Sequence, residues 1–506
     1  MNLIETYDEL FSRFHPHFGR IETYKRARTL AYAHLVTYGR HTISRMICGK
    51  NHQQDDWSAD YKFFSLRKWD AHDLYFEILK ETDHHSHWYR NGVLVAMDES
   101  FRKKTGKKIP KVSTLRDPMS LPYHTNLTPA IRFLQASAII NPEDRMDTTR
   151  AIPVYFEEAA PAKKPKKNDS EQVKEQYKKE QKIKRISVKG HEVLFKIRNQ
   201  VDKLPNGTDR LLFMTVDGSF CNRNFLRDIP ENIVVIARAR KDLKLFMPAE
   251  NIPHTGRGRH KIYGERLPTP DEIRRDDAYP WKTECVYAAG KYHNLKYKVV
   301  SPVLWPKGTG RKRCRLFIIA PLRYRKSKNS KLLYRNPAYL LVTDENIPEK
   351  YLLQYYFFRW DIEVNHRDEK SLFGLGDAQV RSPLSVERNP QFTILVYSLL
   401  LLASINAYGP TRTDDYLPVP KWRKHIDRRP SALDILQKFR REIMIVQLEK
   451  DLDQKARKMT KNKRRRKKPR SLIEAKKRGF ISDQNRDMKP LKLPINIISA
   501  LLYADS

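Results

Sequence analysis

Apolar residues follow two patterns along the chain: short continuous runs, and positions spaced three or four residues apart. Residues 1–88 show the spaced pattern and few continuous runs, which predicts helices. Near-continuous apolar runs occupy residues 92–98 and 211–217, and each run ends in an acid, Asp98 or Asp217. Such runs are typical of strands buried on both faces of a sheet. Further strands are predicted at residues 131–140, 152–156 and 232–237.

The order of these elements predicts an α/β core. Residues 162–185 are rich in lysine and glutamate, and their helical pattern continues towards Leu204. The predicted order is therefore strand, strand, strand, helix, strand, helix, strand. In open α/β sheets, ligands bind at the carboxyl ends of the strands. Asp98 and Asp217 are therefore expected at the edge of the sheet where a ligand would bind.

The remaining patterns divide the chain into domains. Residues 243–343 carry Gly, Pro and short β-type stretches, which predict a β-rich insertion subdomain between two parts of the core, 89–242 and 344–408. Residues 409–506 are predicted to form a helical, basic C-terminal region. Within it, the densely basic run at 455–470 is expected to add sequence-independent affinity for DNA.

The first predicted domain covers residues 1–88. Residues 42–47 are basic and amphipathic, which favours a small helical DNA-binding domain. A plain helical cap on the core would explain the same helical pattern equally well. Near the other end, Ser431 is a suitable N-cap for an amphipathic helix over residues 431–449.

Charge indicates the class of partner. Lys and Arg number 98 against 59 Asp and Glu, a formal net charge of +39. Polyphosphate accounts for such a field, because each neutralised phosphate releases condensed counterions. The four cysteines stand far apart, which predicts neither a zinc ribbon nor a disulfide framework and favours an intracellular protein. The apolar run at 392–402 falls short of the ~20 residues that span a membrane and predicts a buried core helix.

The residues that suggest chemistry lie in a predicted helix at 348–372. At 100° per residue, four polar side chains share one narrow stripe, here called the tetrad: Tyr356, Arg359, Glu363 and Lys370. A neighbouring apolar stripe is expected to pack on the sheet: Leu353, Phe357, Trp360 and Val364. A surface ladder of salt bridges would produce the same polar stripe, but two further acids at the ends of buried strands favour a reactive site.

Phosphodiester cleavage explains this combination of residues. Carboxylate oxygens suit Mg²⁺, and two ions about 3.5–4 Å apart activate a nucleophile and stabilise a leaving oxygen. Asp98, Asp217 and Glu363 are the candidate metal ligands and catalytic residues. Arg359 and Lys370 would hold phosphates, and Tyr356 would hydrogen-bond a phosphate or stack on a base.

Several blocks of sequence, the tetrad among them, resemble a known family. The spacing of the tetrad matches the YREK signature of bacterial insertion-sequence transposases of the DDE class. Residues 97–100, 103–109 and 116–118 resemble the first-aspartate block of that family, and residues 216–220 and 236–242 resemble the second. Residues 374–382 resemble the stretch after the glutamate helix. The resemblance covers about residues 90–405.

This resemblance implies an RNase H-like mixed sheet flanked by helices, a β-rich insertion and an N-terminal domain that binds transposon ends. It implies two Mg²⁺ ions, for which Mn²⁺ is expected to substitute, and a homodimer in the synaptic complex. The DNA partners would be terminal inverted repeats and target DNA, in the nucleoid of a bacterial cytoplasm, with no membrane partner. Arg381 falls in the last block as a DNA contact. A tryptophan of the insertion, Trp281 or Trp305, would contact a flipped base, although a core role suits either.

Some alternatives stay open. Asp98 could be structural, with Asp242 or Asp344 as the second acid of the site. A non-catalytic DNA-binding protein derived from a transposase, or a stand-alone nuclease with the same core, would share much of the sequence pattern. The three intact acids favour the catalytic interpretation over the non-catalytic one.

Overall fold

The computed structural model describes residues 2–448 except 67, 107, 118–120, 122, 125, 250–259, 326–328 and 424–425. The basic run predicted at 455–470 lies outside the described residues. The chain divides into two compact units, Met1–Lys438 and Phe439–Ser506. In the second unit only residues 439–448 are described, and they are helical. The sheets and labelled helices all belong to the first unit.

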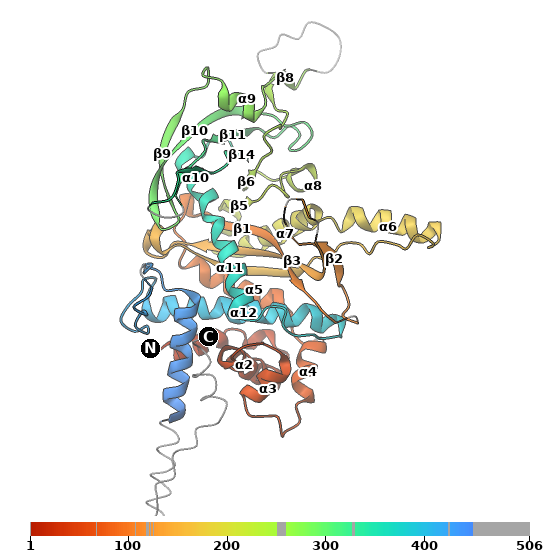
Figure 1. Ribbon diagram of the computed structural model, residues 1–506, viewed down its shortest axis with the longest axis vertical. Coiled ribbons are helices and arrows are strands. Elements are labelled where there is room, and N and C mark those ends of the chain that lie inside the picture. The colour runs from red at the N-terminus through yellow and green to blue at the C-terminus, as the bar shows by residue number, and fades with distance from the viewer. Residues whose placement is uncertain are drawn as a thin grey trace, which may run out of the picture. The chain divides into compact units, whose positions relative to one another are not determined.

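A ten-stranded mixed sheet forms the centre of the first unit (Figure 1). Its order is β2-β3-β1-β5-β6-β14-β11-β10-β9, and β4 also pairs with β3. The strands are β1 (Val93–Lys103), β2 (Ser113–Arg116), β3 (Leu127–Ile140), β4 (Arg150–Glu158), β5 (Leu212–Val216), β6 (Ile233–Arg238), β9 (Lys282–Ala288), β10 (Lys291–Val303), β11 (Cys314–Ile319) and β14 (Ala338–Val342). Two small sheets pair β7 (Phe246–Pro248) with β8 (Tyr263–Arg266), and β12 (Arg323–Tyr324) with β13 (Leu333–Tyr334). The five strands predicted before residue 243 are therefore present.

The middle of the sheet brings Asp98 and Asp217 together. Asp217 directly follows β5 as predicted, but Asp98 lies within β1, which continues to Lys103, so the predicted strand end at Asp98 was wrong. Strand β1 runs parallel to β5, and β5 runs parallel to β6, whereas β3 is antiparallel to β1. All five residues of β5 are buried, as expected for a strand covered on both faces. The register pairs Met97 with Val216, so that Asp98 and Asp217 occupy adjacent positions at the carboxyl ends of their parallel pairing.

The β-rich segment 243–343 extends the same sheet. Strand β14 pairs antiparallel with β6, and β11, β10 and β9 follow outward in turn. Every residue of β11 is buried, so this part of the sheet has an apolar interior of its own. The outer edge of β6, which an insertion folded separately would leave unpaired, is therefore covered by β14.

Helices cover the sheet, and most were predicted. They are α1 (Leu3–Ser12), α2 (Ile21–Val36), α3 (Ile43–Gly49), α4 (Ser58–Ser65), α5 (Ala71–Asp83), α6 (Glu171–Ile183), α7 (Ile186–Val201), α8 (Arg223–Leu226), α9 (Pro270–Arg275), α10 (Glu349–Phe358), α11 (Trp360–Ser371) and α12 (Pro383–Tyr408). The N-terminal helices α1, α4 and α5 pack on α12, which itself packs on β4. Figure 1 shows α12 between the sheet and α2–α4. By length and composition α12 could cross a membrane, but 83% of its most apolar window is buried inside the protein.

The helix predicted at 348–372 is two helices, which corrects the continuous helix expected from the sequence. Arg359 lies between the end of α10 and the start of α11, and its N–H donates to the Tyr356 carbonyl at 3.2 Å. The Ile362 N–H likewise donates to the Arg359 carbonyl at 3.2 Å. Both bonds span three residues instead of four, so the chain turns more tightly here than in an α-helix.

The tight turn changes which residues face the core. Trp360, expected in the buried apolar stripe, is 60% exposed, so that part of the prediction was wrong. Leu353 is fully buried as expected, but the buried face continues through Phe358 and Ile362 instead. A turn with three residues per repeat rotates each following side chain further than the 100° assumed for a regular helix.

Candidate functional site

Two carboxylates stand at the centre of the site: Asp98, which lies within β1, and Asp217, which directly follows β5. The Asp98 side chain is only 16% exposed, and burial raises its pKa, with the charge of Asp217 acting in the same direction. His366 and Arg359 oppose that shift in pKa. Asp217 accepts two hydrogen bonds at Oδ1 from Ser219, one from the backbone N–H at 2.9 Å and one from the hydroxyl at 2.6 Å. The carboxylate of Asp217 is thereby oriented by the loop that follows β5.

Arg359 links the third acid to this pair. Its guanidinium donates to Glu363 Oε1 at 2.8 Å and lies 3.8 Å from Asp98 Oδ2. The Arg359 side chain is 13% exposed, and the Glu363 side chain is 34% exposed. The break between α10 and α11 therefore places one buried cation between an acid of the sheet and an acid of the helix.

The other two members of the tetrad lie on either side of Arg359 and Glu363. Burial raises the pKa of Tyr356, and the charges of Asp217 and Glu363 also raise it. At the far end of α11, burial lowers the pKa of Lys370 to about 8, and the neighbouring charge of Arg102 contributes. Tyr356 thus responds to Asp217 and Glu363, and Lys370 to Asp98, so the whole tetrad shares the electrostatic environment of the acids.

A buried polar network supports the site and escaped the sequence analysis. Glu369 is fully buried and accepts a hydrogen bond from Gln135 of β3 at 2.8 Å. Its other oxygen lies 3.3 Å from His366 Nδ1 and 3.7 Å from the Arg102 guanidinium. Polar residues within otherwise apolar strands, such as Gln135, are the signal that could have revealed this network.

Two of the sequence blocks meet beside the tetrad. The buried Lys104, which follows β1, donates to the Gly376 carbonyl at 2.6 Å and to the Ala378 carbonyl at 2.8 Å. Asp377 in turn accepts a hydrogen bond from the His41 N–H at 2.9 Å. The first-aspartate block, the stretch after the glutamate helix and the N-terminal helices are therefore held together.

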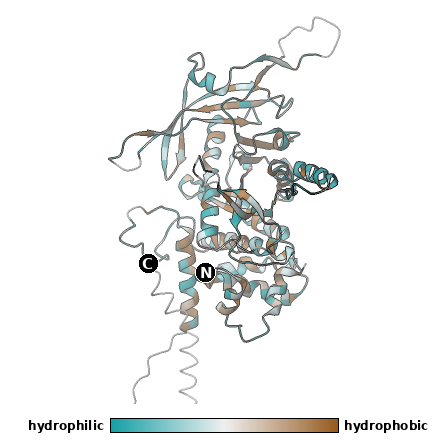
Figure 2. Ribbon diagram, turned by 45° about the vertical axis from the view of Figure 1, so that its right-hand side comes forward, coloured by the Kyte–Doolittle hydropathy of each residue, from teal (hydrophilic) through white to brown (hydrophobic). Residues whose placement is uncertain are grey.

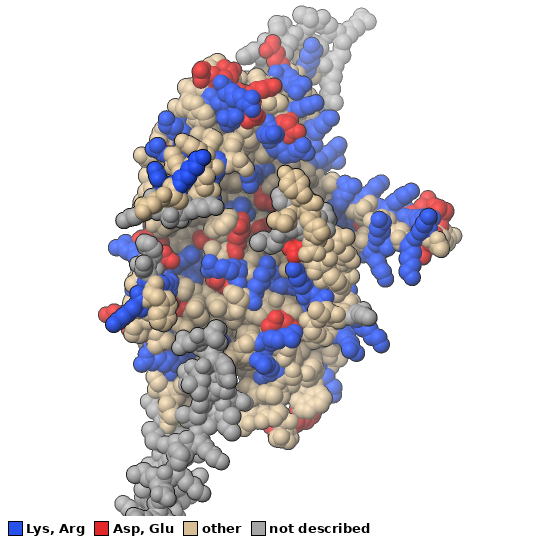
Figure 3. Space-filling view, in the orientation of Figure 1, with Lys and Arg blue, Asp and Glu red and all other residues tan. Residues whose placement is uncertain are grey.

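The predicted DNA contact Arg381 lies in a basic cleft of about 860 Å³. The cleft separates the segment 378–385 from α3 and α4 and is also lined by Arg40 and Arg45. All three arginines are exposed. Figure 3 shows a hollow near the centre of the face, where acidic atoms lie among the surrounding Lys and Arg atoms.

The structure places the two tryptophans in ordinary packing contacts. Trp281 is 39% exposed, and the Lys298 ammonium lies 4.6 Å from the centre of its ring. The Trp305 ring packs directly on Gly308, where an added Cβ would come within 2.0 Å of the ring. A base contact for either tryptophan stays a prediction.

The rival acids lie in different surroundings from Asp217. The Asp242 side chain is 58% exposed and pairs with Arg240. Asp344 accepts hydrogen bonds from the N–H groups of Asn346 and Ile347 and pairs with Arg315, which is a capping role in the loop after β14. Within the described part of the chain, neither acid contacts Asp98 or Glu363, whereas the charge of Asp217 raises the pKa of Asp98.

Two carboxylates at the carboxyl end of a parallel strand pairing, with a helix acid linked to Asp98 by Arg359, form an arrangement suited to metal-dependent phosphodiester cleavage. A sequence model of the DDE superfamily endonuclease family matches residues 13–312, which is more than half of the chain. The chain belongs to this family, whose members cleave DNA and generally use divalent metal ions. The match includes Asp98 and Asp217 and ends before Glu363. No curated protein matches the chain.

The donor set fits a divalent metal chemically. Asp98, Asp217 and Glu363 supply carboxylate oxygens, the ligands that Mg²⁺ prefers. Among the described residues, however, no three His, Cys, Asp or Glu side chains are grouped so as to hold an ion as they stand. Arg359 instead supplies the positive charge between Asp98 and Glu363. A bound cation would therefore take over the role that the guanidinium has in this structure.

Proposed function

We propose that this protein is a DNA transposase that binds the ends of its own mobile element, cleaves the phosphodiester backbone and joins the 3′-hydroxyl ends to target DNA. The observation that carries this proposal is the adjacency of Asp98 and Asp217 on parallel strands, together with the Arg359 bridge to Glu363. Membership of a DNA-cleaving family supports it. The resemblance of the tetrad to the YREK signature of transposases supports the second part of the proposal, the joining of the cut ends to target DNA.

We assign the core to the RNase H-like fold. The order β4-β3-β1-β5-β6, with β3 antiparallel to its neighbours and β1, β5 and β6 parallel, supports this assignment. The helices α6 and α7 connect β4 to β5, and α8 precedes β6, which is the order expected for such a core. The acids then fall at its ligand-binding edge.

The residues of the site divide into metal ligands and DNA contacts. Asp98, Asp217 and Glu363 would hold two Mg²⁺ ions, which lower the pKa of water and stabilise the leaving oxygen. Arg359 would release Asp98 and Glu363 and bind a phosphate with its two parallel N–H groups. Lys370 would hold a second phosphate as a point charge, and the Tyr356 hydroxyl would donate a hydrogen bond to a phosphate or stack on a base.

The partners follow from this activity. Terminal inverted repeats and target DNA would be the substrates, and the two ends would be brought together by a homodimer in the bacterial nucleoid. Arg381 and the arginines of its cleft would contact the backbone beyond the cleaved phosphate. Trp281 and Trp305 stay candidates for a base contact in the β-rich segment.

The decisive experiment is cleavage of a supercoiled plasmid that carries the DNA flanking this gene. With Mg²⁺, the wild type is expected to cut at defined ends and join them to a target, and Glu363→Gln is expected to do neither. Cleavage without joining and without end preference would identify a stand-alone nuclease. Binding by both proteins with no cleavage by either would identify a non-catalytic DNA-binding derivative.

The pKa of Lys370 makes the affinity for DNA pH-dependent. Because burial lowers the pKa of its ammonium to about 8, this lysine loses its positive charge as the pH rises through 8. The affinity of the wild type for duplex DNA is expected to fall by up to about tenfold between pH 7 and pH 9. Lys370→Arg keeps the charge throughout and should show a flatter profile in a fluorescence anisotropy titration. Coincident profiles for the two proteins would contradict this role.

A further inference from the structure

Helix α6 has no buried face. None of its residues is buried, and Val173 and Ile183 are 47% and 63% exposed. Figures 1 and 2 show α6 as a hydrophilic helix that extends away from the sheet. Helices of this length are marginal without packing, so a helix with no buried face gains little from the core.

Positive charge is concentrated on this helix and the loop before it. Residues 162–185, here called the basic arm, contain ten Lys and Arg and four Asp and Glu. Only some of the positive charges are neutralised within the arm: Lys174 pairs with Glu171, and Lys184 pairs with Glu180. Four lysines precede α6 in the segment 163–167, all of them exposed. A polyanion is therefore the complementary partner.

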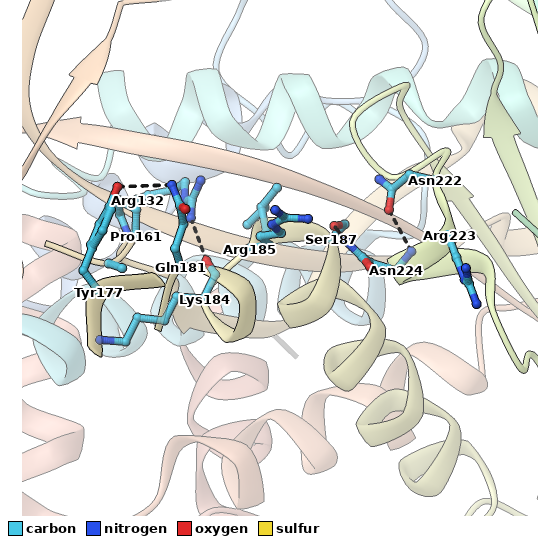
Figure 4. A pocket seen from close by; sticks show the side chains of 12 residues that line it. Arg132, Pro161, Tyr177, Gln181, Lys184, Arg185, Ser187, Asn222, Arg223 and Asn224 are labelled. Atoms are coloured by element: carbon cyan, nitrogen blue, oxygen red, sulfur yellow. Dashed lines mark hydrogen bonds between the residues drawn. The ribbon is translucent and has the colours of Figure 1, made fainter. Parts of the chain in front are cut away.

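A cleft of about 670 Å³ opens at the base of the basic arm and is here called the arm cleft. Four basic side chains line it, and no acidic residue does: Arg132, Lys184, Arg185 and Arg223. In Figure 4 its side chains lie in a row from Tyr177 to Arg223. The exposed Arg185 and Arg223 side chains have no hydrogen bond or ion pair with any described residue of the chain. These two guanidiniums are available to a ligand.

A chain of hydrogen bonds connects the arm cleft to Asp217. Asn222 of the cleft donates to the Ser219 carbonyl at 2.7 Å, and the Ser219 hydroxyl donates to Asp217 at 2.6 Å. The Arg132 guanidinium of the cleft lies 3.7 Å from Glu99, which follows Asp98 in β1 and faces the opposite side of the sheet. The arm cleft is therefore a neighbour of the acid pair on the Asp217 side.

The nature of the ligand follows from this position. A row of cations with hydrogen-bonding Asn and Ser side chains is suited to successive phosphates, because most contacts between proteins and DNA are made to the backbone. We propose that the arm cleft and the basic arm hold the phosphate backbone of duplex DNA beside the reaction centre. This inference rests on the proposed function and adds a place where the DNA runs past Asp217.

The test is duplex binding by Arg185→Ala/Arg223→Ala, measured by fluorescence anisotropy without Mg²⁺ on duplex DNA of arbitrary sequence. Both arginines are exposed, so the fold should persist with an unchanged melting temperature. The affinity is expected to fall about tenfold at low salt, and the slope of log K against log salt to decrease in magnitude by about 2. Lys178→Ala/Lys179→Ala/Lys182→Ala should weaken binding through the arm itself.

The control is Lys291→Ala/Lys307→Ala, which removes the same charge from exposed positions outside the arm cleft. Unchanged affinity in Arg185→Ala/Arg223→Ala, or an equal loss in the control, would overturn the proposal. The same titration with single-stranded DNA and with an acidic peptide tests the kind of ligand. If Arg185→Ala/Arg223→Ala lost affinity for one of these and kept its affinity for duplex DNA, the proposal would also be overturned. The assay needs no cleavage. If Arg185→Ala/Arg223→Ala weakened duplex binding and the control did not, the result would therefore support DNA binding by the arm cleft even if the wild type proved unable to cut DNA.

Discussion

Replacement of Asp217 with asparagine is expected to lower DNA cleavage by about three orders of magnitude and to leave DNA binding almost unchanged. Asparagine keeps the size of the side chain and can still accept the hydrogen bonds from Ser219 at 2.6 and 2.9 Å. It removes the negative charge that a divalent ion needs beside Asp98. A ligand that stabilises the transition state by about 4 kcal/mol corresponds to this loss in rate.

A change of metal distinguishes a metal ligand from a structural acid. Asp217→Cys is expected to be inactive with Mg²⁺ and to regain measurable cleavage with Mn²⁺, because sulfur is a poor ligand for Mg²⁺ and a better one for softer ions. The readout is the rate of plasmid nicking with each ion, beside a wild type that uses both. Equal inactivity of Asp217→Cys with both ions would favour a structural role.

Matched acids serve as controls for this prediction. Asp242→Asn changes an exposed acid paired with Arg240 and is expected to cleave like the wild type. Asp344→Asn removes a cap from the loop after β14 and should affect stability more than rate. Loss of cleavage in either control, with activity retained in Asp217→Asn, would move the second acid of the site to that residue.

The central strands are predictable because each is covered on both faces. Such burial requires a continuous apolar run, and the runs at 92–98 and 211–217 correspond to the first half of β1 and to β5, although β1 continues past Asp98 to Lys103. The continuation of the sheet into residues 243–343 is not predictable in the same way. Pairing of β14 with β6 joins residues about 100 positions apart, and neither periodicity nor composition encodes that partner choice.

In the candidate site, too, some features could be predicted from the sequence and others could not. Asp98 and Asp217 can be found because each ends a local apolar run, and the tetrad can be found because its spacing is local in sequence. The contact of Arg359 with both Asp98 and Glu363 depends on the break between α10 and α11, where two hydrogen bonds span three residues instead of four. The regular 100° rotation per residue that was assumed for one continuous helix does not predict this break. Arg185 and Arg223 of the arm cleft come from two separate segments, so only the folded chain brings them together.

Replacement of the buried Glu369 is expected to have a large effect on the stability of the protein. Glu369→Ala is expected to lower the free energy of unfolding by about 3–5 kcal/mol, because it leaves the cation of Arg102 buried without its partner. Arg102 is 5% exposed and Glu369 is fully buried, so water cannot easily replace the lost charge. Gln135 and His366 lose an acceptor in the same variant. Urea denaturation measures the effect as a lower midpoint at an unchanged slope.

Removal of both charges separates the cost of an unpaired ion from the value of the pair. Arg102→Met/Glu369→Leu is expected to recover most of the lost stability, because a buried ion pair replaced by apolar side chains of similar size is often neutral. Glu363→Gln is the control: its side chain is 34% exposed, and its loss should cost little stability. A Glu369→Ala protein within about 1 kcal/mol of the wild type would show that Arg102 finds compensation elsewhere. Retained DNA binding with poor cleavage in the double variant would show instead that the network serves to position α11, and with it Glu363 and Lys370, against the sheet.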